Sequence, residues 1–483
     1  MIPFPIPTPL GVRYVRRDVA RPRSRRAPRT IRVAAGQGFW GDDQEAPVRQ
    51  VEGGPIDYLA LDYLAEVTMS ILQKQRARDP GAGYARDFVA LAQRILPVCV
   101  ERGIRVVSNA GGVNPRACAA AVMEAARAAG LGGRARVALV TGDDLMDRLD
   151  ELMGAGHPLA HIESGEPLAR VRAQVQSANA YLGARPIVQA LRLDPTVVVT
   201  GRCADAALTY GPLVHEFGWP WDDWDKLAAG VVAGHINECG AQASGGNSMA
   251  EWWTIPNLAG VGFPIIEAEG SGSFVVTKHP GTGGRVDRRV VTEQIVYEIG
   301  DPARYLTPDV AADFTALHLR DEGPDRVRVH GVRGRPAPEM LKVSIAYEDG
   351  WKAFGMLTYA WPDAAAKARA AADIVREKLD RAGLRVDAFR AELVGWDSTL
   401  GVLAGEPPAD LPEVQLRLGV RARDRSAVER FTREVAPLVL NGPPSVTGFA
   451  GGRPKVQEVM AYWPALIARE AVEPHVRVEA LEA

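Results

Sequence analysis

Residues 104–119 read IRVVSNAGGVNPRACA, and this stretch predicts the fold of the first half of the chain. The run 104–108 is typical of a buried strand, and a glycine pair follows it. Asn114 is a preferred helix N-cap and Pro115 suits the first helical position, so we expect a helix over 115–129. Gly130 ends this helix, and 136–141 is strand-like again. This order predicts a parallel β-α-β unit.

The same alternation extends outward from this unit. Strand-like runs occupy three more segments: 31–35, 56–64 and 196–200. Helical periodicity covers two more: 85–102 and 223–235. The predicted fold class is therefore α/β, with a mostly parallel sheet and helices on both faces. We expect four strands to share this sheet: 31–33, 59–61, 106–108 and 138–140.

The pattern changes after about residue 255, and a smaller α+β layer is expected beyond a linker at 331–338. Before the linker we expect strands at 263–268 and 272–277 and a short helix at 292–299. After it, Asp349-Gly350 predicts a hairpin between strands 341–346 and 355–360. A helix (363–382), two strands (391–395 and 414–421) and a helix (426–435) follow, which gives the order β-β-α-β-β-α. The predicted domains are 31–330, which carries the site, and 331–483.

Composition excludes several classes of protein. The 483 residues carry 57 Lys+Arg against 59 Asp+Glu, and this near-neutral balance argues against a nucleic-acid binder. No apolar run reaches the roughly 18 residues of a membrane-spanning helix. The four cysteines form no C-x-x-C pair, which favours a reducing cytoplasm over a disulfide or zinc scaffold. Residues 1–30 hold eight Arg, one Asp and six Pro, and we expect a disordered extension there.

Acidic side chains follow several of the expected strands. Because parallel strands place their carboxyl ends along one edge, where open α/β proteins bind ligands, these acids are expected to converge. The candidate catalytic residues are Asp42, Asp62, Glu66, Asp143 and Asp205. Acids that share a partly buried cleft repel, so at least one should have a raised pKa and act as an acid or base. The alternative is that they are separate helix caps and surface groups.

The loop 109–116 is the strongest candidate binding element. A strand, a glycine pair and a capped helix present free backbone N–H groups and the positive end of a helix to an anion. A purely structural turn could look the same. The candidate substrate-binding residues are Asn109, Gly111, Gly112, Asn114, Arg116, Arg202, Glu238 and Asn247. Arg202 could hold a substrate carboxylate, or form a buried ion pair with Asp205.

Three other motifs are weaker. Gly36 to Gly41 matches G-x-G-x-x-G, but the bulk of Trp40 and the charges of Asp42 and Asp43 argue against a dinucleotide. His235, Glu238 and Cys239 could ligate a metal, yet no second ligand pair accompanies them, so no metal is predicted. The loop 281–284 after Lys278 and His279 could cradle the phosphates of coenzyme A, although loop flexibility alone explains such sequences.

Several unusual strings together resemble the acyclic terpene utilisation AtuA family. They are GFWGDD (38–43), DYLALDYLAEVTMS (57–70), SNAGGVNPRACA (108–119), TGRCADAAL (200–208), GHINECGAQASGGN (234–247), HPGTGG (279–284) and VTEQIVYEIGDPARYLTPDV (291–310). The resemblance runs from about residue 31 to about 467. It implies a bacterial cytoplasmic protein connected with the catabolism of acyclic monoterpenes through acyl-CoA thioesters. Many relatives carry an extra C-terminal ferredoxin-like domain, which we expect this chain to lack. Either a partner supplies that domain, or this member acts on a different substrate.

Two functions are compatible with these features. The first is an enzyme of hydratase or lyase type that acts on a branched acyl-CoA or a related carboxylate, with a carboxylate moving protons next to a carbonyl. The second is a non-catalytic subunit or binding module that serves an acyl-CoA enzyme such as a carboxylase. We expect a small-molecule substrate, no cofactor beyond coenzyme A as part of that substrate, no nucleic acid, no membrane and a homo-oligomer.

Overall fold

The computed structural model describes residues 29–249, 251–447 and 452–481. Residues 1–28 of the predicted extension lie outside this description, whereas Arg29 forms an ion pair with Glu216 and Thr30 begins the first strand. The elements of the first half are β1 (Thr30–Gln37), α1 (Ala46–Gly53), β2 (Tyr58–Leu61), α2 (Glu66–Arg78), α3 (Arg86–Arg102), β3 (Arg105–Ser108), α4 (Pro115–Ala128), β4 (Val137–Thr141), α5 (Leu149–Gly154), β5 (Val175–Ala180), α6 (Arg185–Leu191), β6 (Val197–Thr200), α7 (Ala207–Phe217) and α8 (Trp224–Glu238).

The four strands expected to pair do share one sheet, whose order is β11-β12-β8-β7-β1-β2-β3-β6-β4-β19. The central strands β1, β2, β3, β6 and β4 are parallel, as predicted. The flanking strands all pair antiparallel, so "mostly parallel" was too broad a description of the whole sheet. The reason is connectivity: β7 and β8 are joined by a short turn, which only an antiparallel pair allows.

Helices cover both faces of the central strands. Side chains alternate along β1, so Val33 belongs to one apolar core and its neighbour Ala34 to the other. Helices α1, α3 and α4 pack into the core of Ala34, and α6, α7 and α8 into the core of Val33. Asn114 accepts a hydrogen bond from the N–H of Ala117, which confirms the predicted cap of α4. None of the helices in residues 29–249, 251–447 and 452–481 has the length and apolarity that crossing a membrane requires.

The second half begins with short elements and contains one very long strand. Its elements are β7 (Ile265–Glu269), β8 (Phe274–Thr277), α9 (Arg288–Val296), β9 (Tyr305–Leu306), β10 (Ala311–Asp313), β11 (His318–Asp321), β12 (Val327–His330), β13 (Arg333–Arg335), β14 (Met340–Ala360), α10 (Ala364–Arg381), β15 (Ala388–Val394), β16 (Glu413–Ala422), α11 (Arg425–Val435), α12 (Leu438–Asn441), β17 (Val446–Thr447), β18 (Gln457–Ala468) and β19 (Arg477–Leu481).

The hairpin predicted at Asp349-Gly350 is wrong, because β14 runs straight through these residues. Its pairing with β18 shifts register between Glu348 and Trp351, and Gly350 has φ +84°. A side chain at Gly350 would place its Cβ 2.6 Å from the carbonyl oxygen of Ala422. The Asp-Gly pair therefore makes a β-bulge instead of a turn. The first part of β14 lies between β5 and β18, and the last part pairs with β16 and β17.

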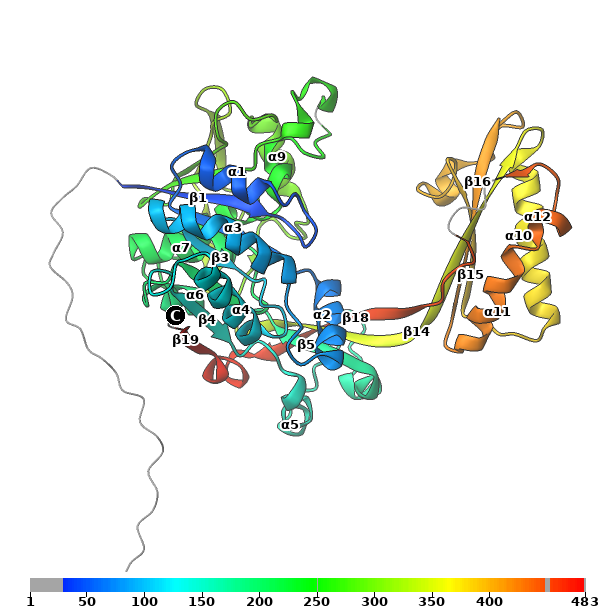
Figure 1. Ribbon diagram of the computed structural model, residues 1–483, viewed down its shortest axis with the longest axis horizontal. Helices are drawn as coiled ribbons and strands as arrows, with labels where there is room; N and C mark the ends of the chain where they lie inside the picture. Colours follow the sequence, from blue (N-terminus) through cyan, green and yellow to red (C-terminus); the bar gives the residue numbers. More distant parts are fainter. Residues whose placement is uncertain (1–28, 250, 448–451, 482–483) are drawn as a thin grey trace, which may run out of the picture.

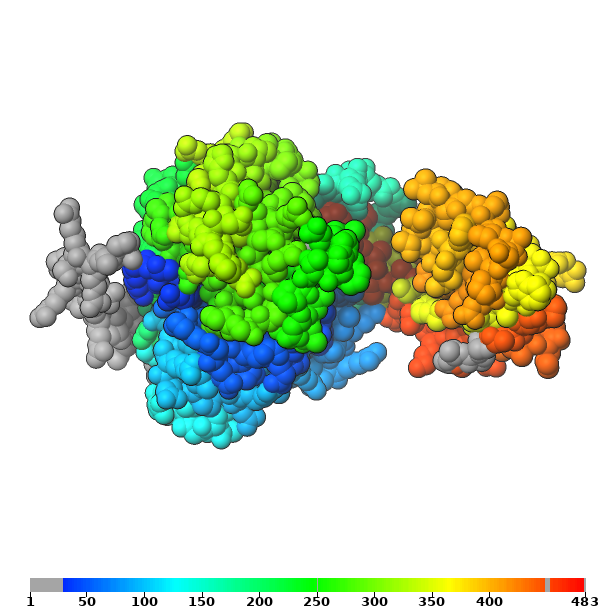
Figure 2. Space-filling view, turned by 90° about the horizontal axis from the view of Figure 1, so that it is seen from above, coloured from blue at the N-terminus to red at the C-terminus, as the bar shows by residue number. Residues whose placement is uncertain are grey.

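The last part of β14 enters a small unit that stands apart from the main body (Figures 1 and 2). Its order is β14-α10-β15-β16-α11-β17/β18, and its strands pair as β15-β16-β14-β17. This β-α-β-β-α-β arrangement is ferredoxin-like and replaces the predicted β-β-α-β-β-α order. Helices α10 and α11 cover one face of this sheet, around Phe431.

The chain then returns to the main body. Strand β18 runs back along β14, and β19 pairs with β4 at the edge of the large sheet. Strands on the two sides of residue 331 therefore pair with each other: β14 pairs with β5, and β19 pairs with β4. The small unit is an insertion carried on the two-stranded stalk of β14 and β18, which leads from the main body to the small unit in Figure 1.

Candidate functional site

A cavity of about 1000 Å³ opens beside the carboxyl ends of β2 and β6. Glu66 begins α2 after β2, and Arg202 and Asp205 follow β6. Tyr181 follows β5, Lys342 lies on β14, and the small sheet β9-β10-β13 forms the opposite wall. Two segments of the second half therefore complete a cavity that starts at the predicted edge of the central sheet.

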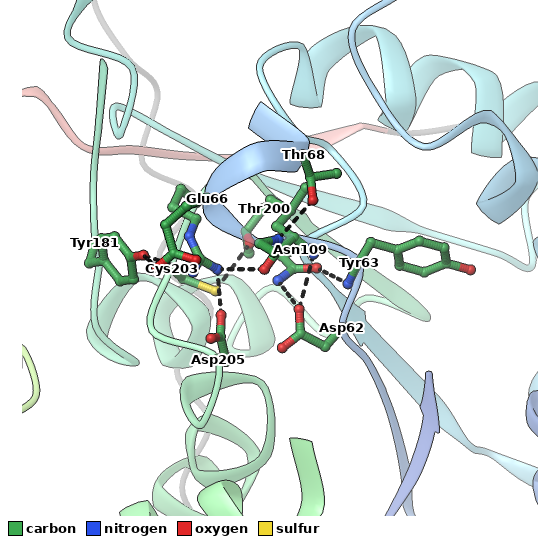
Figure 3. A network of polar contacts seen from close by, with 12 residues as sticks. Asp62, Tyr63, Glu66, Thr68, Asn109, Tyr181, Thr200, Cys203 and Asp205 are labelled. Carbon is green, nitrogen blue, oxygen red and sulfur yellow. Dashed lines mark hydrogen bonds and ion pairs between the residues drawn. The ribbon is translucent and has the colours of Figure 1, made fainter. Parts of the chain in front are cut away.

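Arg202 is the centre of a buried polar network, and Figure 3 labels its partners Tyr181 and Asp205. Its side chain is 1% exposed and its Nη1 donates to the carbonyl oxygen of Leu64 at 3.0 Å and to the Asp205 carboxylate. Its Nη2 donates to the Tyr181 hydroxyl at 3.0 Å. Burial raises the pKa of Asp205, although the Arg202 guanidinium acts in the opposite direction. The side chain of Asp205 stays 34% exposed, so a carboxyl with a raised pKa remains accessible in the cavity.

Glu66 is held in the ionised form at the same site. It accepts a hydrogen bond of 2.7 Å from the Tyr181 hydroxyl, and the Lys342 ammonium lies 3.5 Å away. Burial acts to raise its pKa, but the hydrogen bond from Tyr181 and the charge of Arg202 outweigh this and lower the pKa to about 2. Lys342 and Arg202 both lie over the Tyr181 ring, 4.7 and 4.3 Å from its centre. Of the side chains expected to gather at this edge, Glu66, Arg202 and Asp205 line the cavity.

Asp62 and Asn109 lie directly behind this network. The Asn109 amide donates to Asp62 at 2.7 Å, and its oxygen accepts from the N–H of Tyr63 at 2.7 Å. Burial, and then the charge of Asp205, raise the pKa of Asp62 well above its ordinary value. Both side chains are buried and neither lines the cavity. Asp62 therefore interacts with the cavity through charge, and the charge of Asp205 raises its pKa.

Glu238 reaches the cavity from the end of α8, next to His235. His235 Nδ1 lies 3.1 Å from Glu238 Oε1. Burial raises the pKa of Glu238, while the hydrogen bond with His235 acts against this rise. In the described residues, no group of three or more His, Cys, Asp or Glu side chains is arranged to hold a metal ion.

Asp143 is buried outside the cavity. Its Oδ2 accepts from the N–H of Arg202 at 2.8 Å and from the Asn179 amide at 3.0 Å, so it anchors the loop after β6. Burial raises the pKa of Asp143 to about 7.

The free energy of unfolding of Asp143→Asn, relative to that of the wild type, should rise between pH 5 and pH 8. The folded protein keeps the Asp143 proton up to about pH 7, whereas the unfolded chain releases it near pH 4. The wild type therefore loses stability across this window, by as much as about 1.4 kcal/mol per pH unit, and the variant does not. Urea denaturation at pH 5 and 8 measures the difference. Asp150→Asn, at an exposed acid, is the control, and a pH-independent difference would contradict the assignment.

The remaining predicted site residues lie elsewhere. Asp42 accepts from the N–H groups of Gly38 and Asp43 and so closes its own loop. The Asn114 amide donates to the carbonyl oxygens of Pro80 and Ala82, and the exposed Arg116 pairs with Glu479 at 2.8 Å. Asn247 is exposed on the 245–249 loop. None of these four residues lines the cavity.

The glycine pair of the candidate anion loop serves packing. A Cβ at Gly111 would lie 2.5 Å from the carbonyl oxygen of Thr200. Gly112 has φ +55°, and a Cβ there would lie 2.4 Å from Leu72. The glycines let the loop approach β6 and α2 closely, and neither lines the cavity.

The loop considered for coenzyme A phosphates also has internal partners. The Lys278 ammonium is 3% exposed and lies 2.9 Å from the Asp325 carboxylate and 2.9 Å from the carbonyl oxygen of Thr282. His279 Nε2 contacts the carbonyl oxygen of Gln50 at 3.0 Å. This basic pair therefore stabilises the loop itself.

Sequence reasoning missed the residues that complete the cavity. Among the lining residues that were not candidates are Tyr181, Lys342, Arg304 and Arg335. Tyr181 follows β5 and Lys342 lies on β14, whereas Arg304 precedes β9 and Arg335 lies on β13. Arg304 lies within the string 291–310, but no motif surrounds the other three residues. Even Tyr181 is 21 positions away from Arg202. Only the pairing of β5 with β14 brings Tyr181 and Lys342 together.

The family model for "Acyclic terpene utilisation family protein AtuA" matches residues 31–478. No curated protein and no solved structure matches the chain.

Proposed function

The chain belongs to the acyclic terpene utilisation AtuA family, and from this premise we propose that it is an acid–base enzyme of hydratase or lyase type. Its substrate would be a branched acyl compound with a carbonyl head, either a coenzyme A thioester or a free carboxylate. The observation that carries the proposal is Asp205, an accessible carboxyl with a raised pKa that is fixed by a buried guanidinium. A carboxyl group with a raised pKa can act as a general acid or base.

The outer part of the cavity suits an aliphatic chain. Four lining side chains are apolar and partly exposed: Ile162 (50%), Leu306 (52%), Met340 (38%) and Leu466 (45%). Their exposed surface would be buried by an acyl chain, and apolar burial is worth about 25 cal/mol per Å². Arg304 and Arg335 also line the cavity and supply positive charge for a carboxylate or a phosphate.

The inner part supplies the chemistry. In our proposal the Asp205 carboxylate removes a proton from the carbon next to the carbonyl group. The Lys342 ammonium stabilises the negative charge that develops on the carbonyl oxygen. The ionised Glu66 and the Tyr181 ring hold Lys342 at the site.

The test is a turnover assay on a panel of branched 2-enoyl and 3-hydroxyacyl compounds, each as the coenzyme A thioester and as the free acid. The loss or appearance of the conjugated double bond is followed by absorbance. We expect turnover of at least one pair, and a loss of about 100-fold in Asp205→Asn. Glu124→Gln is the control, because Glu124 is an exposed residue of α4 that does not line the cavity. Binding without any turnover would favour the non-catalytic binding module instead.

A further inference from the structure

His235 is buried in the last turn of α8 and is fixed by two hydrogen bonds with Gln294 of α9. Its ring is 2% exposed, and its Nε2 lies 3.0 Å from the backbone oxygen of Gln294. In return the Gln294 side-chain amide donates to the backbone oxygen of His235 at 3.0 Å. The rings of Tyr305 and Phe314 pack around the imidazole, with centres 5.8 and 5.6 Å away. The ring therefore has one defined orientation.

This geometry places a shared proton between His235 and Glu238. A backbone carbonyl oxygen only accepts hydrogen bonds, so Nε2 must carry a hydrogen. The other ring nitrogen, Nδ1, lies 3.1 Å from Glu238 Oε1. Two bare acceptors would repel at this distance, so one proton lies between them, on either Nδ1 or the carboxyl group. The other oxygen of Glu238 has no hydrogen-bond partner in the described part of the chain and is available to a ligand.

The surroundings favour retention of this proton at neutral pH. Three acidic groups face the pair: Asp205 from the loop after β6, Asp62 from the loop after β2, and Glu298 after α9. Two basic groups, Arg304 and Arg335, line the same cavity. Tyr305 of β9 and Cys239 are neutral neighbours. Burial lowers the pKa of His235, but the hydrogen bond and charge of Glu238 outweigh this and raise it. Burial raises the pKa of Glu238. The pair therefore releases its proton at a higher pH than an isolated histidine.

We propose that Glu238 is the general acid of this cavity and that His235 is the positioning residue with which it shares the proton. This inference rests on the proposed function and narrows its substrate to a 3-hydroxyacyl compound. Asp205 takes the proton from the carbon next to the carbonyl, and the electrons of that C–H bond form the new C=C bond. The C–O bond of the hydroxyl breaks as Glu238 delivers its proton, so one water leaves and Asp205 holds the abstracted proton. The reverse sequence hydrates the enoyl compound.

The first test needs no substrate. Histidine-selective nitrogen NMR on the full chain, with His235 identified by His235→Gln, reports both ring nitrogens across a pH titration. We expect the ring nitrogens of His235 to report a pKa above the ordinary histidine value. Glu238→Gln should lower its pKa by at least one unit, a tenfold loss of proton affinity. Glu124→Gln should change nothing. A His235 pKa that is unchanged in Glu238→Gln overturns the shared proton.

The second test uses the 3-hydroxyacyl compound that the wild type dehydrates. We expect Glu238→Gln to lower kcat by about 100-fold or more with little change in KM. His235→Gln should lower kcat less and shift the alkaline limb of the pH profile, which a merely structural role would not do. Full turnover in Glu238→Gln beside an inactive Asp205→Asn overturns the assignment. If the wild type turns over no compound of the panel, the proposed function and the assignment of Glu238 as its acid both fail, while the NMR result still decides the shared proton.

Discussion

Replacing Arg202 with Met is expected to lower the free energy of unfolding by about 3–5 kcal/mol. The guanidinium is 1% exposed and satisfies the Asp205 carboxylate, the carbonyl oxygen of Leu64 and the Tyr181 hydroxyl. Methionine fills much of the volume but donates no hydrogen bond, so a partly buried carboxylate and a buried carbonyl oxygen lose their partner. Urea denaturation near neutral pH measures the loss.

The matched control is Arg304→Met, which changes an exposed arginine on the rim of the same cavity. Surface substitutions of this kind change stability by no more than about 0.5 kcal/mol. If Arg202→Met were as stable as Arg304→Met, the network of Figure 3 would contribute nothing to folding. A second variant, Arg202→Met with Asp205→Asn, should recover part of the loss because the unpaired carboxylate is removed as well.

Phe431→Ala is expected to cost about 3–5 kcal/mol in the small unit while the main body stays folded. Phe431 is fully buried between α11 and the sheet of this unit, and the unit has an apolar core of its own. The cavity left by the phenyl ring should therefore raise amide hydrogen exchange in β15, β16, α10 and α11, and leave β3 and β6 protected. Hydrogen exchange followed by mass spectrometry resolves the two regions.

Phe354→Ala is the control for this experiment, because Phe354 lies on β14 in the same unit but is 48% exposed. We expect a much smaller effect from its removal. Equal loss of protection in β3 and β6 in Phe431→Ala would mean that the two bodies unfold as one unit, and would contradict the description of separate cores.

Local sequence patterns were enough to predict the central strands of the large sheet. The strands 104–108 and 136–141 and the capped helix between them depend on residues close in sequence, and Asn114 does cap α4. The alternation of Val33 and Ala34 between two cores likewise follows from strand geometry. Where a local pattern was ambiguous the prediction was wrong: Asp349-Gly350 suits both a turn and a bulge, and only the pairing partners β16 and β18 select the bulge.

By itself the sequence determined the parallel centre of the sheet, and it named four charged residues that line the cavity: Glu66, Arg202, Asp205 and Glu238. The first three follow parallel strands, whose carboxyl ends lie along one edge of a sheet. It could not separate them from Asp42 and Asn114, which also follow strands. Asp42 accepts hydrogen bonds within its own loop, and the Asn114 amide donates to the carbonyl oxygens of Pro80 and Ala82. Tyr181, Lys342 and the shared proton of His235 were decided by tertiary structure alone. The pairing of β5 with β14 brings Tyr181 and Lys342 together, and Gln294 of α9 fixes the His235 ring. Such contacts between distant parts of the chain depend on tertiary packing and not on local spacing.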